Sequence, residues 1–135
     1  MKLDNIEYLR MDSDSPQIIE EWGWKYHHIG IPTEKKMENE KYIPHLKFFV
    51  PGFEKSPYGI EWMRSEKDSP IHELIQKTPH IAFEVENLDL ELSKRKFEVL
   101  TKPNSPSDDV KVAMIKHNGA PIELIEFKKP VANNI

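Results

Sequence analysis

Apolar and polar residues alternate along several short segments of the chain, which is the pattern of strands that bury one face. The clearest alternation lies in residues 80–85, where the apolar positions are Ile81, Phe83 and Val85. Segments rich in β-branched and aromatic residues predict further strands at residues 28–32, 46–50, 59–64, 110–115 and 121–127. Asn118-Gly119 joins the last two and is typical of a tight hairpin turn.

Helices are expected to be few and short, because 11 prolines and 5 glycines interrupt the chain. Ser15 and Pro16 predict the start of one helix, as a capping residue followed by the residue favoured at the first helical position. A second helix is predicted from a cap at Asn87 to about Phe97. Residues 104–109 are polar and contain proline, and they are expected to form a turn or loop.

The length of 135 residues is that of one domain with one modest core. The expected organisation is an N-terminal extension, a single domain of two modules, and a tail, at residues 1–25, 26–128 (modules 26–66 and 78–127) and 129–135. The charged N-terminus does not resemble a signal peptide, and no apolar run approaches the roughly 20 residues of a membrane helix. We therefore expect a cytoplasmic protein without a membrane partner.

Charge and cysteine usage exclude several classes of site. The chain has 19 Lys+Arg against 23 Asp+Glu and no basic stripe, so nucleic acid is not an expected partner. Because the chain has no cysteine, disulfides, thiolate metal sites and cysteine nucleophiles are excluded. A metal ion in this protein must therefore be held by histidine, carboxylate or water.

A histidine begins a strand in each half of the chain, and a glutamate lies in a later strand of the same half: His28 with Glu61, and His80 with Glu123. Each glutamate has apolar neighbours on both sides, and burying an unpaired carboxylate is costly. If all four residues face the inside of one curved sheet, they form a set suited to a divalent first-row metal ion. The alternative is that they are solvated residues of half-exposed strands, but their repeated order favours the metal site.

Four strings, at residues 27–32, 59–63, 79–85 and 118–127, resemble the vicinal oxygen chelate superfamily. This superfamily includes glyoxalase I, methylmalonyl-CoA epimerase, extradiol dioxygenases and bleomycin-resistance proteins. The resemblance covers nearly all of the chain outside the extension. It implies an α+β fold in which paired βαβββ modules form a cupped mixed β-sheet around a metal site, with short or degenerate helices.

The resemblance also implies a ligand set and a chemistry. The metal ligands would be His28, Glu61, His80 and Glu123, with His28 preferred to His27 because it precedes Ile-Gly-Ile as His80 precedes Ile-Ala-Phe. The implied ion is nickel, zinc, cobalt or manganese. The implied activity is that of a lactoylglutathione lyase-like (glyoxalase I-type) lyase or isomerase. It would act on a small 2-oxo compound or its thiol adduct through a metal-stabilised enediolate, with Glu123 as first candidate for the base and Glu61 as second.

Three other functions compete with this one. An acyl-CoA epimerase would use the same metal chemistry, a dioxygenase would hold Fe(II) with His28, His80 and Glu123 only, and a bleomycin-resistance-type protein would bind a ligand without catalysis. A homodimer is expected because small sheets expose their edges, with the cupped sheet formed either within one chain or across the dimer. The connection at residues 33–42 departs from the family, because it is almost entirely polar and has no apolar stripe for a packed helix.

Overall fold

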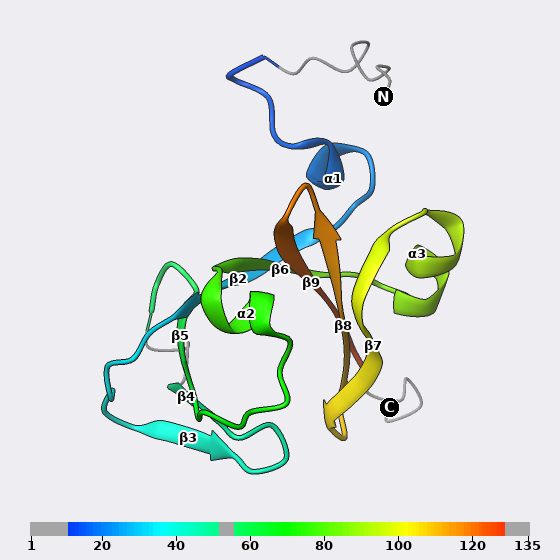
Figure 1. Cartoon of the computed structure of the whole chain (residues 1–135). Coiled ribbons are helices and arrows are strands. Elements are labelled where there is room, and N and C mark those ends of the chain that lie inside the picture. Colours follow the sequence, from blue (N-terminus) through cyan, green and yellow to red (C-terminus); the bar gives the residue numbers. More distant parts are fainter. Residues whose placement is uncertain (1–10, 52–55, 129–135) are drawn as a thin grey trace, which may run out of the picture.

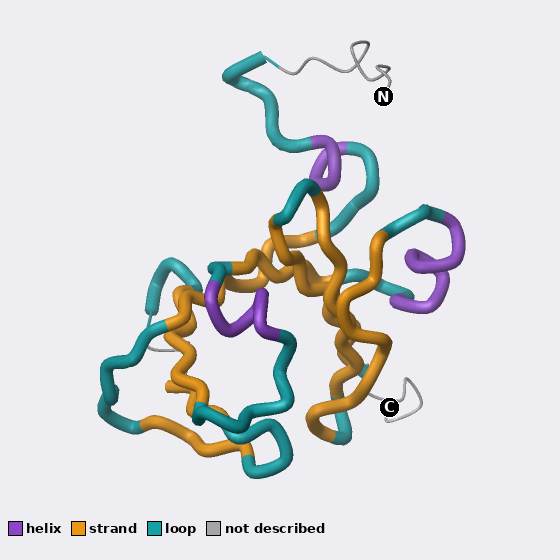
Figure 2. The backbone as a smooth tube through the Cα atoms, viewed as in Figure 1, coloured by secondary structure: helices purple, strands orange, loops and turns teal. Residues whose placement is uncertain are grey.

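The computed structural model of the chain describes residues 11–51 and 56–128, so the expectations for residues 1–10 and for the tail 129–135 lie outside it. Within the described residues, eight strands form one curled sheet that three short helices accompany (Figures 1 and 2). The helices are α1 (Gln17–Glu20), α2 (Glu73–Lys77) and α3 (Leu88–Lys94). The strands are β2 (Lys25–Pro32), β3 (Glu40–Ile43), β4 (Phe48–Pro51), β5 (Ile60–Ser65), β6 (His80–Glu84), β7 (Glu98–Ser107), β8 (Val110–His117) and β9 (Ala120–Phe127).

The sheet consists of two halves with the same connectivity. Its strand order is β3-β4-β5-β2-β6-β9-β8-β7. In each half the first strand pairs in parallel with the fourth, β2 with β5 and β6 with β9, and the other pairs are antiparallel. The antiparallel pair of β2 and β6 joins the halves at the centre of the sheet. The predicted cupped mixed sheet of paired modules is therefore confirmed, and a single chain forms it.

Some local expectations need correction. The loop predicted at residues 104–109 is wrong for residues 104–107, which belong to β7. Because β7 is an outer strand and its pairing with β8 shifts register three times, it tolerates prolines that a central strand would exclude. The first helix has Pro16 rather than Ser15 at its N-cap, and no side chain caps it. The sequence also gave no sign of β3 or α2, which are short.

The polar connection at residues 33–39 contains no helix, as its lack of an apolar stripe predicted. In the second half, the corresponding connection contains α3, whose N-terminus is capped by Asn87 Oδ1 accepting a hydrogen bond from the Leu90 N–H at 3.0 Å. None of the helices in the described part of the chain is long and apolar enough to cross a membrane.

Two hydrophobic clusters lie on opposite faces of the sheet, as the successive residues Ala113 and Met114 of β8 show. One cluster includes a residue of α3 and consists of Trp24, Val85, Leu88, Ala113, Ile115 and Leu124. The other consists of Phe48, Met63, Ile75 and Met114. Because Ile75 belongs to α2, this helix packs against residues of both halves, in the opening between them (Figures 1 and 2).

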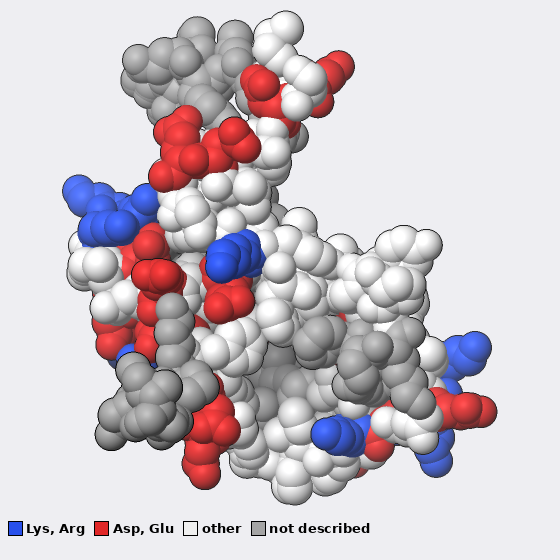
Figure 3. Space-filling model, turned by 180° about the vertical axis from the view of Figure 1, so that it is seen from behind, with Lys and Arg blue, Asp and Glu red and all other residues white. Residues whose placement is uncertain are grey.

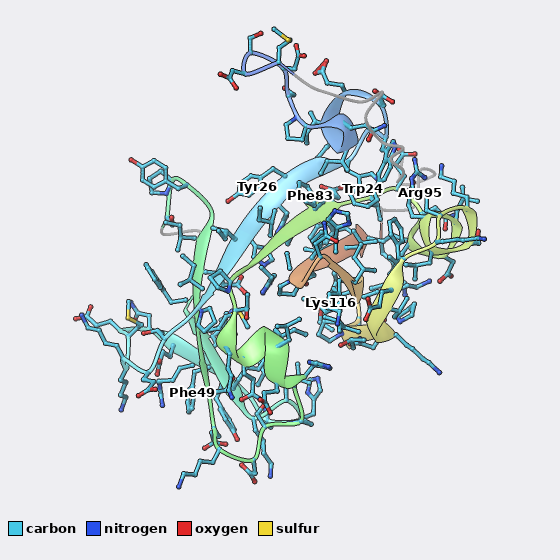
Figure 4. All side chains as sticks on the ribbon, turned by 45° about the horizontal axis from the view of Figure 1, so that its top comes forward. Trp24, Tyr26, Phe49, Phe83, Arg95 and Lys116 are labelled. Carbon is cyan, nitrogen blue, oxygen red and sulfur yellow. The ribbon has the colours of Figure 1, made fainter. Side chains whose placement is uncertain are left out.

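The segment that precedes β2 is fixed to the second half by aromatic and charged contacts. Trp24 is buried, and its Nε1–H donates a 3.1 Å hydrogen bond to Oε1 of Glu91 in α3. Arg95 donates to the same oxygen at 3.0 Å and lies 3.9 Å from the ring centre of Trp22. These donors compensate the burial of the Glu91 carboxylate. Figure 4 shows Trp24 beside Phe83, where their ring centres are 5.9 Å apart.

Replacement of Trp24 should therefore destabilise the whole domain. We expect Trp24→Ala to lower the free energy of unfolding by about 3–5 kcal/mol, the usual cost of removing a buried tryptophan. Trp24→Phe should cost less, because it keeps an aromatic ring and loses only the donor to Glu91. Chemical denaturation measures both, with the exposed Leu90→Ala as control. A loss for Trp24→Ala no larger than that of the control would contradict this packing role.

Candidate metal centre

The register of the sheet brings the four predicted residues to one region. Across the central pair of strands, His28 lies opposite Ala82 and Gly30 lies opposite His80. Glu61 of β5 is opposite Gly30, which is two residues after His28. In this half, the glutamate is therefore opposite the second residue after the histidine.

In the second half the glutamate is Glu123 of β9. It is opposite Ala82, which is likewise the second residue after the histidine of that half, His80. Glu123 is also opposite Met114 of β8, which belongs to the cluster containing Ile75. Residues directly opposite each other on paired strands share a face of the sheet. The polar residues therefore lie on the same face as this cluster, inside the cup.

Three of the four predicted residues converge closely. Oε1 of Glu123 lies 3.0 Å from Nε2 of His80 and 3.5 Å from Nε2 of His28. One ligand atom from each of these residues falls within 4.8 Å of the other two. Glu61 is outside this group of three, although its Oε1 lies 3.9 Å from Nε2 of His28. The geometry thus brings together one complete set of two imidazoles and one carboxylate, with a second carboxylate beside it.

Small residues make room for these side chains. A Cβ added to Gly30 would lie 2.3 Å from Cε1 of His80, well inside the contact distance. Ala82, at the corresponding position of the other half, is fully buried. The imidazoles of His28 and His80 are themselves buried, with 5% and 4% of the residue exposed. A larger residue at position 30 would therefore displace the His80 ring.

The charges of the site are mutually stabilised. Burial raises the pKa of Glu123, but its polar and charge interactions with the imidazoles of His28 and His80 together lower it by more, to about 2. Burial lowers the pKa of His28, whereas its contact with Glu123 raises it by more, and the net direction is upward. Glu123 is therefore a carboxylate at neutral pH, held between two imidazole rings.

The donor set fits a divalent ion. Imidazole nitrogen and carboxylate oxygen bind zinc and similar ions at about 2.1 Å, which places neighbouring ligand atoms about 3–3.5 Å apart. The distances from Glu123 to His80 and His28, 3.0 and 3.5 Å, lie in this range. Nδ1 of His80 is buried and has no hydrogen-bond partner among the described residues. The ring of His80 is accordingly oriented through Nε2, the nitrogen that faces the carboxylate.

His27 contributes differently from the four predicted residues. Its Nδ1 lies 2.8 Å from Nδ1 of His28, on the side of that ring away from the carboxylates. The geometry therefore favours His28 over His27 as the residue that faces the centre. Sequence reasoning treated His27 only as a rival ligand. The sequence held no signal of this contact, because neighbouring residues of a regular strand point to opposite faces of the sheet.

Charged residues elsewhere on the molecule are mixed in sign. On the face shown in Figure 3, basic side chains lie in separate small groups among acidic ones. One well-formed pair of this kind is Arg64 with Glu40, whose side chains are joined by hydrogen bonds of 2.9 and 2.7 Å. Arg64 also lies 4.0 Å from the ring centre of Phe49. This pair ties β5 to the start of β3 and is separate from the histidines.

Comparison with known proteins identifies the fold. No protein-family model matches the sequence, and no curated protein matches it. A hypothetical protein from Bacillus halodurans C-125 has a similar structure, with a TM-score of 0.62 and 21% identity over 82% of this chain and 99% of that one. Methylmalonyl-CoA epimerase from Mycobacterium tuberculosis is also similar, with a TM-score of 0.56 and 16% identity over 82% of this chain and 92% of its own. At these identities the likeness is one of fold.

Replacement of Gly30 tests how tightly the site is packed. We expect Gly30→Ala to lower the free energy of unfolding by about 1–3 kcal/mol, because the new methyl group overlaps the His80 ring. In a His80→Ala background the same change should cost much less, since the overlapping ring is gone. Urea denaturation of the four proteins of this cycle measures the difference. Equal costs in both backgrounds would show that the methyl group clashes elsewhere.

Proposed function

The chain has the vicinal oxygen chelate fold, and from this premise we propose that it is a metal-dependent lyase or isomerase of the glyoxalase type. The proposed reaction moves a proton between neighbouring carbon atoms of a small 2-oxo compound or its thiol adduct. The observation that carries the proposal is the convergence of His28, His80 and Glu123 inside the cup. The proposal includes Glu61 as a further ligand, because its carboxylate lies beside His28.

The bound ion would be nickel, zinc, cobalt or manganese, and its contribution is to polarise a carbonyl oxygen of the substrate. The chain supplies the rest of the chemistry. His28 and His80 present Nε2 toward the centre, and their burial excludes water from the back of the site. Because Glu123 lies on the inner face of the sheet, the proposed substrate approaches it from inside the cup.

Glu123 is the proposed base, with Glu61 as second candidate. A general base must accept a proton from the carbon next to the carbonyl group. The interactions with the imidazoles of His28 and His80 keep the pKa of Glu123 near 2, so the carboxylate is a weak base while it is held there. We therefore propose that the Glu123 side chain turns away from the histidines as it accepts the proton, which restores its ordinary basicity.

A second candidate function is an Fe(II)-dependent dioxygenase. The observation that favours it is that the close group contains two histidines and one carboxylate, the usual ligands of such iron sites, without Glu61. An acyl-CoA epimerase is a variant of the first proposal, since it needs the same proton transfer on a longer substrate. One of the similar solved structures described above is named as an epimerase. Metal identity separates the dioxygenase from the other two functions.

The remaining expectations stay proposals. We propose that residues 26–128 act as one domain and that two copies form a dimer, because β3 and β7 end the described sheet as outer strands. A small molecule is the proposed partner. The cytoplasmic location stays a prediction from the sequence.

Metal analysis of the purified protein tests the proposal directly. We expect nearly one equivalent of nickel, zinc, cobalt or manganese in the wild type, and its loss in His80→Ala because a buried ligand is removed. The exposed His45→Ala is the matched control and should keep the metal. Plasma mass spectrometry measures all three proteins. Iron in place of these metals would favour the dioxygenase, and no metal after reconstitution would overturn both proposals in favour of a ligand-binding protein.

Proton exchange with solvent tests the role of Glu123. The assay follows deuterium entering the carbon next to the carbonyl of a thiohemiacetal or an acyl thioester, by NMR. We expect Glu123→Gln to slow exchange by about 100-fold or more, the usual contribution of a general base. Glu34→Gln, in the exposed polar connection, is the control. Full turnover by Glu123→Gln would contradict this role, and a loss confined to Glu61→Gln would assign it to Glu61.

A further inference from the structure

We propose that His27 is a positioning residue, whose Nδ1 accepts a hydrogen bond from Nδ1–H of His28 and so fixes Nε2 of His28 as the ligand atom. The proposal rests on the metal site proposed above. It adds a residue outside the four predicted ligands and assigns a specific proton to the contact between two neighbouring histidines.

The contact is short enough to define a hydrogen bond. The two Nδ1 atoms are 2.8 Å apart, and the ring planes are inclined by 75°. Two ring nitrogens at this distance need one proton between them, because one must donate and the other accept. The opposite nitrogen of His28, Nε2, faces Glu123 at 3.5 Å and Glu61 at 3.9 Å. His28 therefore has an outer side that contacts His27 and an inner side that contacts the carboxylates.

An irregularity in the sheet makes this contact geometrically available. Tyr26 pairs with Phe83, but His28 pairs with Ala82, so His27 is an extra residue in β2. In a regular strand, neighbouring side chains point to opposite faces and their rings would not meet. The extra residue re-aims the His27 ring toward His28. The ring of Phe127 also packs on His27, with 5.2 Å between ring centres.

The second half of the sheet has no such arrangement. The residue before His80 is Pro79, whose side chain cannot form a hydrogen bond. Nδ1 of His80 has no hydrogen-bond partner in residues 11–51 and 56–128, and this ring instead lies against Gly30. The two histidines therefore differ at Nδ1, where His28 contacts a neighbouring imidazole at 2.8 Å and His80 has only the close packing of its ring against Gly30.

The direction of the proton decides whether His28 can bind a metal. When His28 donates from Nδ1, its Nε2 can present a lone pair toward the carboxylates and an ion. If His27 donated the hydrogen bond instead, a neutral His28 would carry its proton on Nε2. That atom could then not bind a metal ion. Outer hydrogen-bond partners of metal-binding histidines typically change metal affinity by about 10- to 100-fold.

Two substitutions separate the hydrogen bond from simple packing. His27→Ala removes the acceptor, whereas His27→Asn can place its Oδ1 near the position of Nδ1. Zinc affinity is measured by competition with a chelator, and His45→Ala is the control. We expect His27→Ala to bind zinc about 10- to 100-fold more weakly, and His27→Asn and the control to stay within about threefold of the wild type. Unchanged affinity of His27→Ala, or an equal loss in both His27 variants, would overturn the proposal.

Nitrogen NMR of the zinc-bound protein tests the same hydrogen bond independently. With zinc on Nε2 of His28, we expect a proton on Nδ1 of His28 and, on the neutral His27, a proton on Nε2 only. A proton on Nδ1 of His27 in a protein that binds zinc would overturn the positioning role alone. Failure of the wild type to bind any of the tested metals would overturn the proposed function and this role with it.

Discussion

The register of the central strands β2 and β6 is the constraint on which the rest of the site depends. Side chains along a strand alternate between its two faces, so a slip of one residue in the pairing would move the side chains of the candidate site to the other face. The observed register sets Gly30 opposite His80 and His28 opposite Ala82. Because β5 and β9 pair with the outer sides of these strands, the same register also delivers the two glutamates.

The cost of burying charge further restricts which residues can occupy the candidate site. Glu123 lies against two buried imidazoles, and its interactions with them outweigh the cost of removing the carboxylate from water. Gly30 leaves the volume that the His80 ring occupies. A chain that kept the histidines but lost the small residue would keep the fold and distort the site. The available volume and the electrostatic interactions therefore both restrict which side chains these few positions can hold.

The residues of the candidate site could be selected from the sequence because their signals are local. A histidine just before alternating apolar residues, and a glutamate between apolar residues, are visible in any short window. The structure differs from the expectation in one respect, since β2 begins at Lys25 and His28 lies inside it. The position of Glu61 outside the close group depends on how the sheet curls, which no local pattern records. The extra residue at His27 was hidden for a related reason, since it appears only when β2 is aligned with β6. Strand β7 was missed because its prolines suggest a loop, although an outer strand accepts them.

The two histidine contacts of Glu123 differ in what they connect. His80 belongs to the same half of the sheet as Glu123, whereas His28 belongs to the other half. Helix α2 also joins both halves, because its Ile75 packs in one cluster with Met63 and Met114. A molecule that entered the cup and spread the halves would therefore lengthen the contact to His28 and leave the contact to His80 intact. The separation of the two halves therefore sets the distance between His28 and Glu123, whereas the distance between His80 and Glu123 is set within one half.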